Sequence, residues 1–481
     1  MKKIINKIIK EKNFLSLTAN MSVAVFGFLS FILLTRSLEK NYFGEWVLFI
    51  TAANFIEMLR FGITRTAIIR FLSGSEDEER KKFIGSNWVI GLYATIIIAI
   101  LLIAIRLAFP ESISQSGFQL FFTWYPLLAF LNLPFNNAVS ILQADQEFGK
   151  ILFIRIIQTG LFVIFLFFNL FFLKYNIFWI VIIYLIIQFI TSVISMIKGW
   201  DGIKYIRKAN RKTNKIILDF GKYTTGTLIG SNLLKSSDTF ILGISTFLGT
   251  TGVALYSVPL KLTEIIEIPL RSFLATAYPK MSKYSMQGNL KEFKKTYYTY
   301  AGAITYLLIP ILVISFIFAE EFVVLIGGKE YLHTANIFKI FAVYGLFLPI
   351  DRFTGVALDS INRPKKNFYK VVWMAVSNII GDIFVIFFVM KAVTTLVLIT
   401  FISQSAFSFD NLFFASAQYS FYVTLQGVAV VTIIMTVIGM LAGYHYLRNE
   451  MDIHFRYIFS EGLNFYKKGL QQFLSSDKNN K

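Results

Sequence analysis

The chain has 481 residues, of which 56% are hydrophobic and only 16% charged, and 47 Lys and Arg against 28 Asp and Glu give it a formal net charge of +19. Soluble domains carry about 25% charged residues, so this composition excludes an ordinary soluble enzyme and predicts a protein whose surface faces lipid. The absence of cysteine excludes a disulfide scaffold and a cysteine-ligated metal, and three histidines argue against a histidine-built metal site. We expect no cofactor.

Apolar stretches long enough to cross a membrane follow one another along the chain. A helix needs about 20 apolar residues to cross about 30 Å of hydrocarbon, and residues 1–13 precede the first such stretch as a basic amphipathic N-terminus. The predicted spans are 14–35, 44–72, 83–109, 118–143, 151–173, 176–198, 218–247, 253–280, 297–319, 333–359 and 367–390. A further apolar region, 392–447, has a single charge, Asp410, and its length suits two crossings. We therefore predict an all-α integral membrane protein with 12, 13 or 14 transmembrane helices.

Basic residues mark one side of the predicted membrane. The N-terminus and the loop at residues 198–222 are rich in Lys and Arg, whereas the loops on the other side carry few. The positive-inside rule places this basic side in the cytoplasm. The basic excess then sets the topology and faces membrane phospholipid, which argues against a nucleic-acid partner. Two crossings between 392 and 447 would put the basic tail outside, against the same rule.

An internal repeat divides the chain in two. Residues 41–82 can be laid over 249–295, because each segment begins with an outside turn that contains Gly (Gly44, Gly252), continues as a span with polar residues and ends in a charged inside loop. The match predicts two pseudo-symmetric six-helix lobes around a central cationic cavity. The predicted parts are an N-lobe at 14–200, a cytoplasmic linker at 201–215, a C-lobe at 216–420, an additional or final helix at 421–447 and a basic amphipathic tail at 448–481.

Three stretches resemble a known family. They are LTRSLEKNYFGEWVLF, the run SNLLKSSDTFILG followed by TGVALYSVPLKLTEIIEIPLRSFLATAYPKMS, and VLIGGKEYLHTANIFKIFAVYGLFLP. They are similar to segments of the polysaccharide and O-antigen flippases of the multidrug/oligosaccharidyl-lipid/polysaccharide exporter superfamily, and the resemblance covers about residues 14–390. It implies a multi-pass protein of the bacterial inner membrane that moves undecaprenyl-diphosphate-linked oligosaccharide from the inner to the outer leaflet by alternating access. It also implies a polysaccharide polymerase machinery as a partner.

Charged side chains inside the predicted spans are the candidate functional groups, because a charge at mid-bilayer costs at least about 2.5 kcal/mol and is usually functional or paired. A diphosphate carries dense negative charge, and Arg offers it a planar fork of donors. The candidates for the diphosphate site, all expected to be buried, are Arg60, Arg65, Arg155, Lys235 and Arg271. The candidates for sugar binding are Asn132, Asn136, Gln143 and Gln158. Those for coupling to H⁺ or Na⁺, with no coupling as the alternative, are Glu57, Asp238, Glu264 and Glu267.

The same side chains also fit structural roles. The pairs spaced to neutralise each other one helical turn apart are Lys235 with Asp238, Lys261 with Glu264, and Glu267 with Arg271. Arg65 and Arg155 are alternatively placed to snorkel toward the inner interface. The amide stripe of the fourth span serves equally well as packing between helices.

Three classes of function are weighed. A flippase for an anionic cargo is favoured, because basic side chains outnumber acidic ones among the charged residues of the spans. An ion-coupled multidrug exporter on the same scaffold would want an acidic cavity. A membrane-embedded polysaccharide polymerase or ligase would need a sizeable outside loop, whereas the outside loops are short, so we predict that the protein is not an enzyme. The sequence contains no Walker-A pattern, which argues against direct ATP drive.

Overall fold

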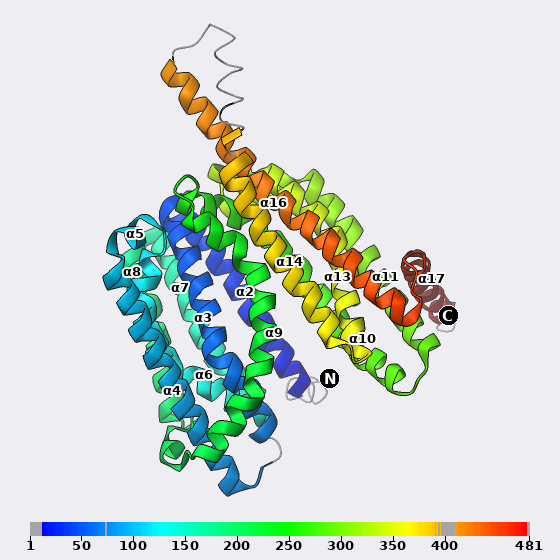
Figure 1. Ribbon diagram of the computed structural model, residues 1–481, viewed down its shortest axis with the longest axis horizontal. Coiled ribbons are helices and arrows are strands. Elements are labelled where there is room, and N and C mark those ends of the chain that lie inside the picture. The colour runs from blue at the N-terminus through cyan, green and yellow to red at the C-terminus, as the bar shows by residue number, and fades with distance from the viewer. Residues whose placement is uncertain (1–11, 73–74, 390, 393–394, 396–408, 479–481) are drawn as a thin grey trace. The chain divides into compact units, whose positions relative to one another are not determined.

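The computed structural model describes residues 12–72, 75–389, 391–392, 395 and 409–478, and the elements within these ranges are helices (Figure 1). The chain forms two compact units. Unit 1 comprises Met1–Asn232 and Leu242–Ala254, and unit 2 comprises Leu233–Ile241 and Leu255–Lys481. The helices α9 and α10 therefore each contribute residues to both units.

Unit 1 contains the first six predicted spans. Its helices are α2 (Lys12–Ser37), α3 (Lys40–Leu72), α4 (Asp77–Ala108), α5 (Pro110–Gln115), α6 (Gln119–Ala144), α7 (Phe148–Phe168) continued by the π-helical turn η1 (Asn169–Leu173), α8 (Ile177–Ile197), the 3₁₀ turn η2 (Ile203–Lys208) and the first part of α9 (Arg211–Ile244). Each predicted span between 14 and 198 coincides with one of the long helices.

The helix α6 forms the centre of unit 1, since it packs against α3, α4 and α8. Pro126 and Pro134 lie inside it. Proline is tolerated in a membrane helix where neighbouring side chains satisfy main-chain carbonyls. Two carbonyls of α6 have such partners. The carbonyl of Ala129 accepts a hydrogen bond from the guanidinium of Arg60 in α3, and the carbonyl of Leu131 accepts one from the hydroxyl of Ser192 in α8.

The segment predicted as a linker, 201–215, packs tightly against α4. The indole nitrogen of Trp88 donates to the carbonyl of Asp201 at 2.6 Å. The backbone of η2 approaches so closely that a Cβ on Gly85 would collide with the Tyr205 carbonyl oxygen. The two compact units meet along the chain within α9, after Asn232, and the segment 201–215 lies wholly inside unit 1.

Unit 2 holds the later spans. Besides residues 233–241 of α9, its elements are most of α10 (Gly249–Met286), α11 (Leu290–Ile317), α12 (Ala319–Gly327), the 3₁₀ turn η3 (Lys329–Thr334), α13 (Ala335–Ser360), α14 (Pro364–Phe384) continued by the π-helical turn η4 (Val385–Val389), α16 (Phe409–Met451) and α17 (Arg456–Lys478). Asn289 begins α11 by accepting a hydrogen bond from the Glu292 backbone, and Pro364 occupies the start of α14, where a missing N–H is harmless.

The internal repeat is visible in the packing. The helix α13 is the fourth span of its lobe, as α6 is of the first, and it packs against α11, α14 and α16. The third span packs on the fourth in both units (α4 on α6, α11 on α13), and the sixth packs on the fourth and fifth (α8 on α6 and α7, α16 on α13 and α14). The prediction of two pseudo-symmetric lobes is confirmed, while the cavity between them stays a prediction.

Membrane-spanning character is distributed unevenly over these helices. Eight helices of the described chain are long and apolar enough to cross a membrane, or nine if the bent pair Lys40–Gly62 and Thr64–Leu72 counts as one span. The helices α2, α9 and α10 match predicted spans but are outside that set of eight, and α9 and α10 carry several of the candidate charges. The eight or nine apolar helices confirm the prediction of a multi-pass membrane protein.

The region 392–447, whose length suits two crossings, is described by the structure mainly from residue 409 onward. Residues 409–451 form the single helix α16, and residues 396–408 lie outside the described part of the chain. Arg363, directly before α14, and Lys366, in the first turn of α14, donate to Glu450 near the end of α16. The amphipathic tail thus starts at the end of unit 2 that holds two predicted cytoplasmic loops, as the charge rule requires.

The tail helix α17 is held on α11. The backbone of His454 donates to the Tyr298 hydroxyl at 3.0 Å, and Lys294 donates to the Asp452 carbonyl at 3.1 Å. Farther along, Gly302 of α11 meets Gly462 of α17, where added side chains would collide with backbone. The tail is therefore packed against the second unit as well as amphipathic.

Candidate functional site: clustered charges in each unit

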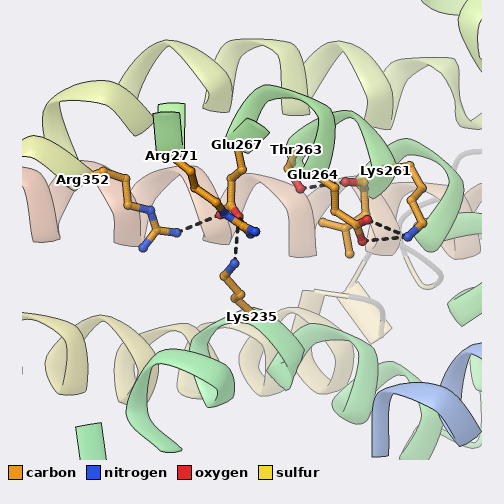
Figure 2. A network of polar contacts seen from close by, with 8 residues as sticks. Lys235, Lys261, Thr263, Glu264, Glu267, Arg271 and Arg352 are labelled. Atoms are coloured by element: carbon orange, nitrogen blue, oxygen red, sulfur yellow. Dashed lines mark hydrogen bonds and ion pairs between the residues drawn. The ribbon is translucent and has the colours of Figure 1, made fainter. Parts of the chain in front are cut away.

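A cluster of three cations around one carboxylate lies in unit 2 (Figure 2). Glu267 of α10 accepts hydrogen bonds from Lys235 of α9 at 2.9 Å, from Arg352 of α13 at 3.3 Å and from Arg271, one turn farther along α10. One carboxylate neutralises one of three positive charges, so the cluster keeps a net positive charge. We call these four residues the cation cluster.

The cations of the cluster are partly open, whereas its carboxylate is not. The side chain of Glu267 is 13% exposed, against 30% for Arg352, 45% for Lys235 and 69% for Arg271. Each guanidinium has five N–H donors, and each arginine here directs one terminal nitrogen to Glu267. The cluster therefore holds its cations together around a carboxylate that is less exposed than they are, and it keeps further donors for an anion.

Helical spacing explains the ion pairs within α10 but not the partner of Lys235. On α10 the expected inter-turn pairs are present, since Glu267 pairs with Arg271 and Lys261 pairs with Glu264 at 2.8 Å. The expected pair of Lys235 with Asp238 is wrong, because Lys235 instead donates to Glu267 on the next helix. The expectation that Lys235 and Arg271 are buried is also wrong, since their side chains are 45% and 69% exposed.

Asp238 belongs to a second, buried cluster in unit 2. Its carboxylate accepts hydrogen bonds from Tyr256 of α10 at 2.6 Å, from Asn378 of α14 at 2.6 Å and from Thr432 of α16 at 3.0 Å. Asn378 also donates to Asp382, which is fully buried beside Asp238. Four helices thus surround two neighbouring carboxylates, which we call the carboxylate pair.

The carboxylate pair needs a compensating positive charge. Two like charges side by side in a buried site repel each other strongly, and a proton or a cation held between them would remove that repulsion. Among the described residues, one oxygen of Asp382 and the amide oxygen of Asn378 have no hydrogen-bond partner. These acceptor oxygens beside the pair suit a proton or a small hard cation such as Na⁺.

In unit 1, Arg60 and Glu57 of α3 form a closed ion pair. Arg60 is 1% exposed and donates to Glu57, to Thr95 of α4 and to the Ala129 carbonyl of α6 at 2.8 Å. Glu57 also accepts from the Tyr125 hydroxyl at 2.9 Å and from the Asn136 amide at 2.8 Å. Of the five expected diphosphate ligands Arg60 is the most deeply buried, but its donors are directed to its own unit. Asn136, an expected sugar ligand, likewise bonds to Glu57.

Arg65 and Arg155 lie near each other in the same unit. Arg65 of α3 donates to Gln143 of α6 at 3.0 Å, and Arg155 of α7 is close enough for the two positive charges to repel. Each arginine is seven residues from the end of its helix, about 10 Å at 1.5 Å per residue. Both therefore sit near the predicted inner interface, where either anion binding or snorkelling is consistent with their depth.

The remaining expected sugar ligands are not brought into one site. Gln158 of α7 donates to Gln188 of α8, which is a packing contact within unit 1. The oxygen of Asn132 is buried and has no hydrogen-bond partner among the described residues. Gln143 alone lies beside a candidate cation.

Four charged residues that spacing did not single out also lie inside helices. Arg352 joins the cation cluster and Asp382 the carboxylate pair, while Lys370 of α14 forms a buried pair with Asp351 of α13 at 2.6 Å. Each is a charge within a predicted span, 333–359 or 367–390. Charged residues are rare inside membrane spans, and their presence there was the signal in the sequence that could have identified them.

Relatives of known description agree with the fold. The protein called probable low-salt glycan biosynthesis flippase Agl15, from Haloferax volcanii, is 21% identical over 181 residues, and the match covers 38% of this chain and 38% of that relative. An inward-facing multidrug resistance MATE family transporter of the MOP superfamily superposes with a TM-score of 0.69 at 14% identity, over 91% of this chain and 99% of the other. The lipid II flippase MurJ in an inward closed conformation gives 0.65 at 16% identity, over 96% and 92%. At these identities, the solved structures establish the fold.

The family is established by a match of another kind. A family model described as polysaccharide biosynthesis protein matches residues 33–336, which extend from the first span of unit 1 into the centre of unit 2. That range is more than half of the chain and includes Glu57, the cluster helix α10 and the start of α13. The chain therefore belongs to the polysaccharide biosynthesis protein family, as the resemblance in its sequence predicted.

Proposed function

We propose that this protein is a flippase that moves an undecaprenyl-diphosphate-linked oligosaccharide from the inner to the outer leaflet of a bacterial cytoplasmic membrane by alternating access. The observation that carries the proposal is the cation cluster, in which Lys235, Arg271 and Arg352 surround the single carboxylate of Glu267. The family, the glycan flippase among the relatives and the fold shared with a lipid II flippase support the same class of cargo.

The chemistry of the cluster suits a diphosphate. Each phosphate of a diphosphate bridge is an anion with several acceptor oxygens, and guanidinium groups bind such oxygens through paired, charge-assisted hydrogen bonds. Glu267 holds the three cations within reach of one another before cargo arrives, which lowers the cost of ordering them on binding. Because the cation cluster has a net positive charge, it can bind one anionic group in addition to Glu267.

A substitution series tests this site. In cells that lack their own copy of the gene, the double variant Arg271→Gln and Arg352→Gln should lower surface glycan display about tenfold or more, because charge-assisted hydrogen bonds contribute about 1.5–3 kcal/mol each. Oligosaccharide-linked diphospholipid should accumulate on the cytoplasmic leaflet. Lys261→Gln, on the same helix but paired with Glu264, is the matched control. Normal glycan display by the double variant would overturn the proposed site.

We propose further that the carboxylate pair couples transport to H⁺ or Na⁺. Of the four expected coupling residues, Asp238 is the one with a second carboxylate beside it, whereas Glu57, Glu264 and Glu267 each pair with a cation. Asp382→Asn keeps the shape and removes one charge. Transport by this variant should lose its dependence on a pH or Na⁺ gradient, and an unchanged dependence would remove the pair from the cycle.

A multidrug exporter is the second candidate, and the fold shared with MATE transporters favours it. Such a protein would bind cationic cargo, which the net positive charge of the cation cluster would repel. Accumulation assays with a cationic dye in the same cells separate the two functions. Dye export that disappears in Asp382→Asn, together with normal glycan display, would support the exporter against the flippase.

A further inference from the structure

A groove of about 630 Å³ opens in unit 1 between the end of α4, the short helix α5 and the first turns of α6. Its volume falls within the range of ordinary ligand sites, about 300–1,000 Å³. The walls are mainly apolar and include Ile103 and Leu107 of α4 with Phe122, Pro126 and Leu127 of α6. Ile103, Leu107 and Leu127 are exposed large hydrophobic side chains, so protein does not cover this wall.

Local sequence explains why the groove exists. Pro110 follows the end of α4, and the residue before a proline is disfavoured in the helical conformation, so the helix ends at Ala108. The chain then turns into α5, and α6 starts only at Gln119. The helix α5 therefore covers the end of the space between α4 and α6, while the side of that space stays open.

One cation stands at the rim of the groove. Arg106 lines it from the last turn of α4, its side chain is exposed, and within the described residues it makes no hydrogen bond or ion pair. The helix α4 is one of the clear membrane spans, so its last turn lies where hydrocarbon gives way to headgroups. Arginine at that depth keeps its guanidinium at headgroup level. Gln119 and Thr123 of α6 line the same groove.

We propose that this groove binds an anionic phospholipid of the surrounding bilayer, with the lipid phosphate on Arg106 and an acyl chain along the wall formed by α4 and α6. The guanidinium matches a phosphate in charge and in hydrogen-bond geometry. The apolar wall matches the chain, and it lies at hydrocarbon depth, where a soluble anion does not reach. The proposal concerns lipid bound beside unit 1, and it holds whether or not the protein transports a glycan.

Native mass spectrometry of the full chain in detergent tests the site with two lipids of matched chains, phosphatidylglycerol and phosphatidylcholine. The unaltered protein should bind phosphatidylglycerol more tightly. Arg106→Gln should weaken that binding about tenfold, as expected for loss of one charge-assisted contact, and Arg106→Lys should restore most of it. The matched control is Lys174→Gln, which removes an exposed cation at the end of η1, outside the groove, and should change nothing.

A second variant tests the apolar wall without touching the charge. Thr123→Phe places a ring in the groove and should weaken binding of both lipids, while thermal unfolding shows whether the fold is kept. Equal losses for Arg106→Gln and Lys174→Gln would overturn the proposal, because they would show attraction by net charge alone. Displacement of phosphatidylglycerol by inorganic phosphate at similar concentration would also overturn it, since the site would then bind free anions.

Discussion

Each unit contains a glutamate paired with an arginine on the same helix, but the two pairs differ in how the protein encloses them. In unit 1, Glu57 and Arg60 are surrounded by Tyr125, Thr95 and Asn136, and Arg60 is 1% exposed. In unit 2 the arginine paired with Glu267 is 69% exposed, and two further cations share the carboxylate. The first pair is closed and electrically balanced, whereas the second is open and carries excess positive charge.

This difference shows that an intramembrane charge has to be judged by its partners as well as by its depth. A fully enclosed pair contributes to the folded state, because removing one partner leaves an uncompensated buried charge. An open pair contributes little to stability, since solvent screens its charges and ordering two long side chains costs entropy. Only the open arrangement leaves donors for a cargo, which is why the cation cluster carries the proposed function and Arg60 does not.

The strongest test of the comparison is the closed pair of unit 1. Arg60→Met removes the cation and leaves the Glu57 carboxylate, which is 17% exposed, unpaired among groups arranged for a charge, so we expect a loss of about 3–5 kcal/mol in the free energy of unfolding. Thermal unfolding in detergent measures it. The double variant Arg60→Met and Glu57→Gln should recover much of the loss, since no charge is then stranded. A single variant as stable as the original protein would mean that the pair is not structural.

A second closed pair tests whether the loss of stability depends on how enclosed a pair is or on the unit in which it lies. Lys370 and Asp351 lie in unit 2 and are about as enclosed as Arg60, with side chains 3% and 4% exposed. Lys370→Met should therefore cost about 3 kcal/mol, close to the effect in unit 1 and unlike that of the open cluster in its own unit. The same thermal assay compares them, with Lys370→Met and Asp351→Asn together as the recovery control. A negligible loss would break the link between enclosure and stability.

The smallest change in stability is expected in the open cluster. Arg271→Gln removes a cation that is mostly exposed, and Lys235 and Arg352 still neutralise Glu267. The free energy of unfolding should fall by no more than about 1 kcal/mol, while transport falls severalfold in the glycan assay. Stability and transport that decline together in this variant would show that the cluster is structural, like the pair in unit 1.

Much of the architecture could be predicted from local patterns. The apolar runs, their spacing and the side on which Lys and Arg gather anticipated the long helices from α2 to α14 and the two lobes. The region after residue 390 was harder, because its apolar composition gives no charged loop from which to count crossings. Contacts of Glu450 with Arg363 and Lys366, far apart in the chain, were needed to place the end of α16.

The partners of the charges were predicted less well. Lys235 and Asp238 are three residues apart on α9 and could have neutralised each other. Lys235 instead donates to Glu267, and Asp238 accepts from Asn378. Spacing along one helix shows which groups are able to meet. Which of them do meet depends on what the adjacent helices present, and Arg352, Asn378 and Asp382 come from spans whose register on α9 and α10 no local pattern specifies.

The amino-acid sequence by itself determined that this chain crosses a membrane many times, in two related halves, with a positive side and a set of charges inside its spans, because hydrophobic length and charge placement act locally. Only the tertiary structure decided which charges are enclosed and which remain open. That choice follows from the packing of helices distant in the chain, where each carboxylate takes the donors that its neighbours bring within hydrogen-bond reach.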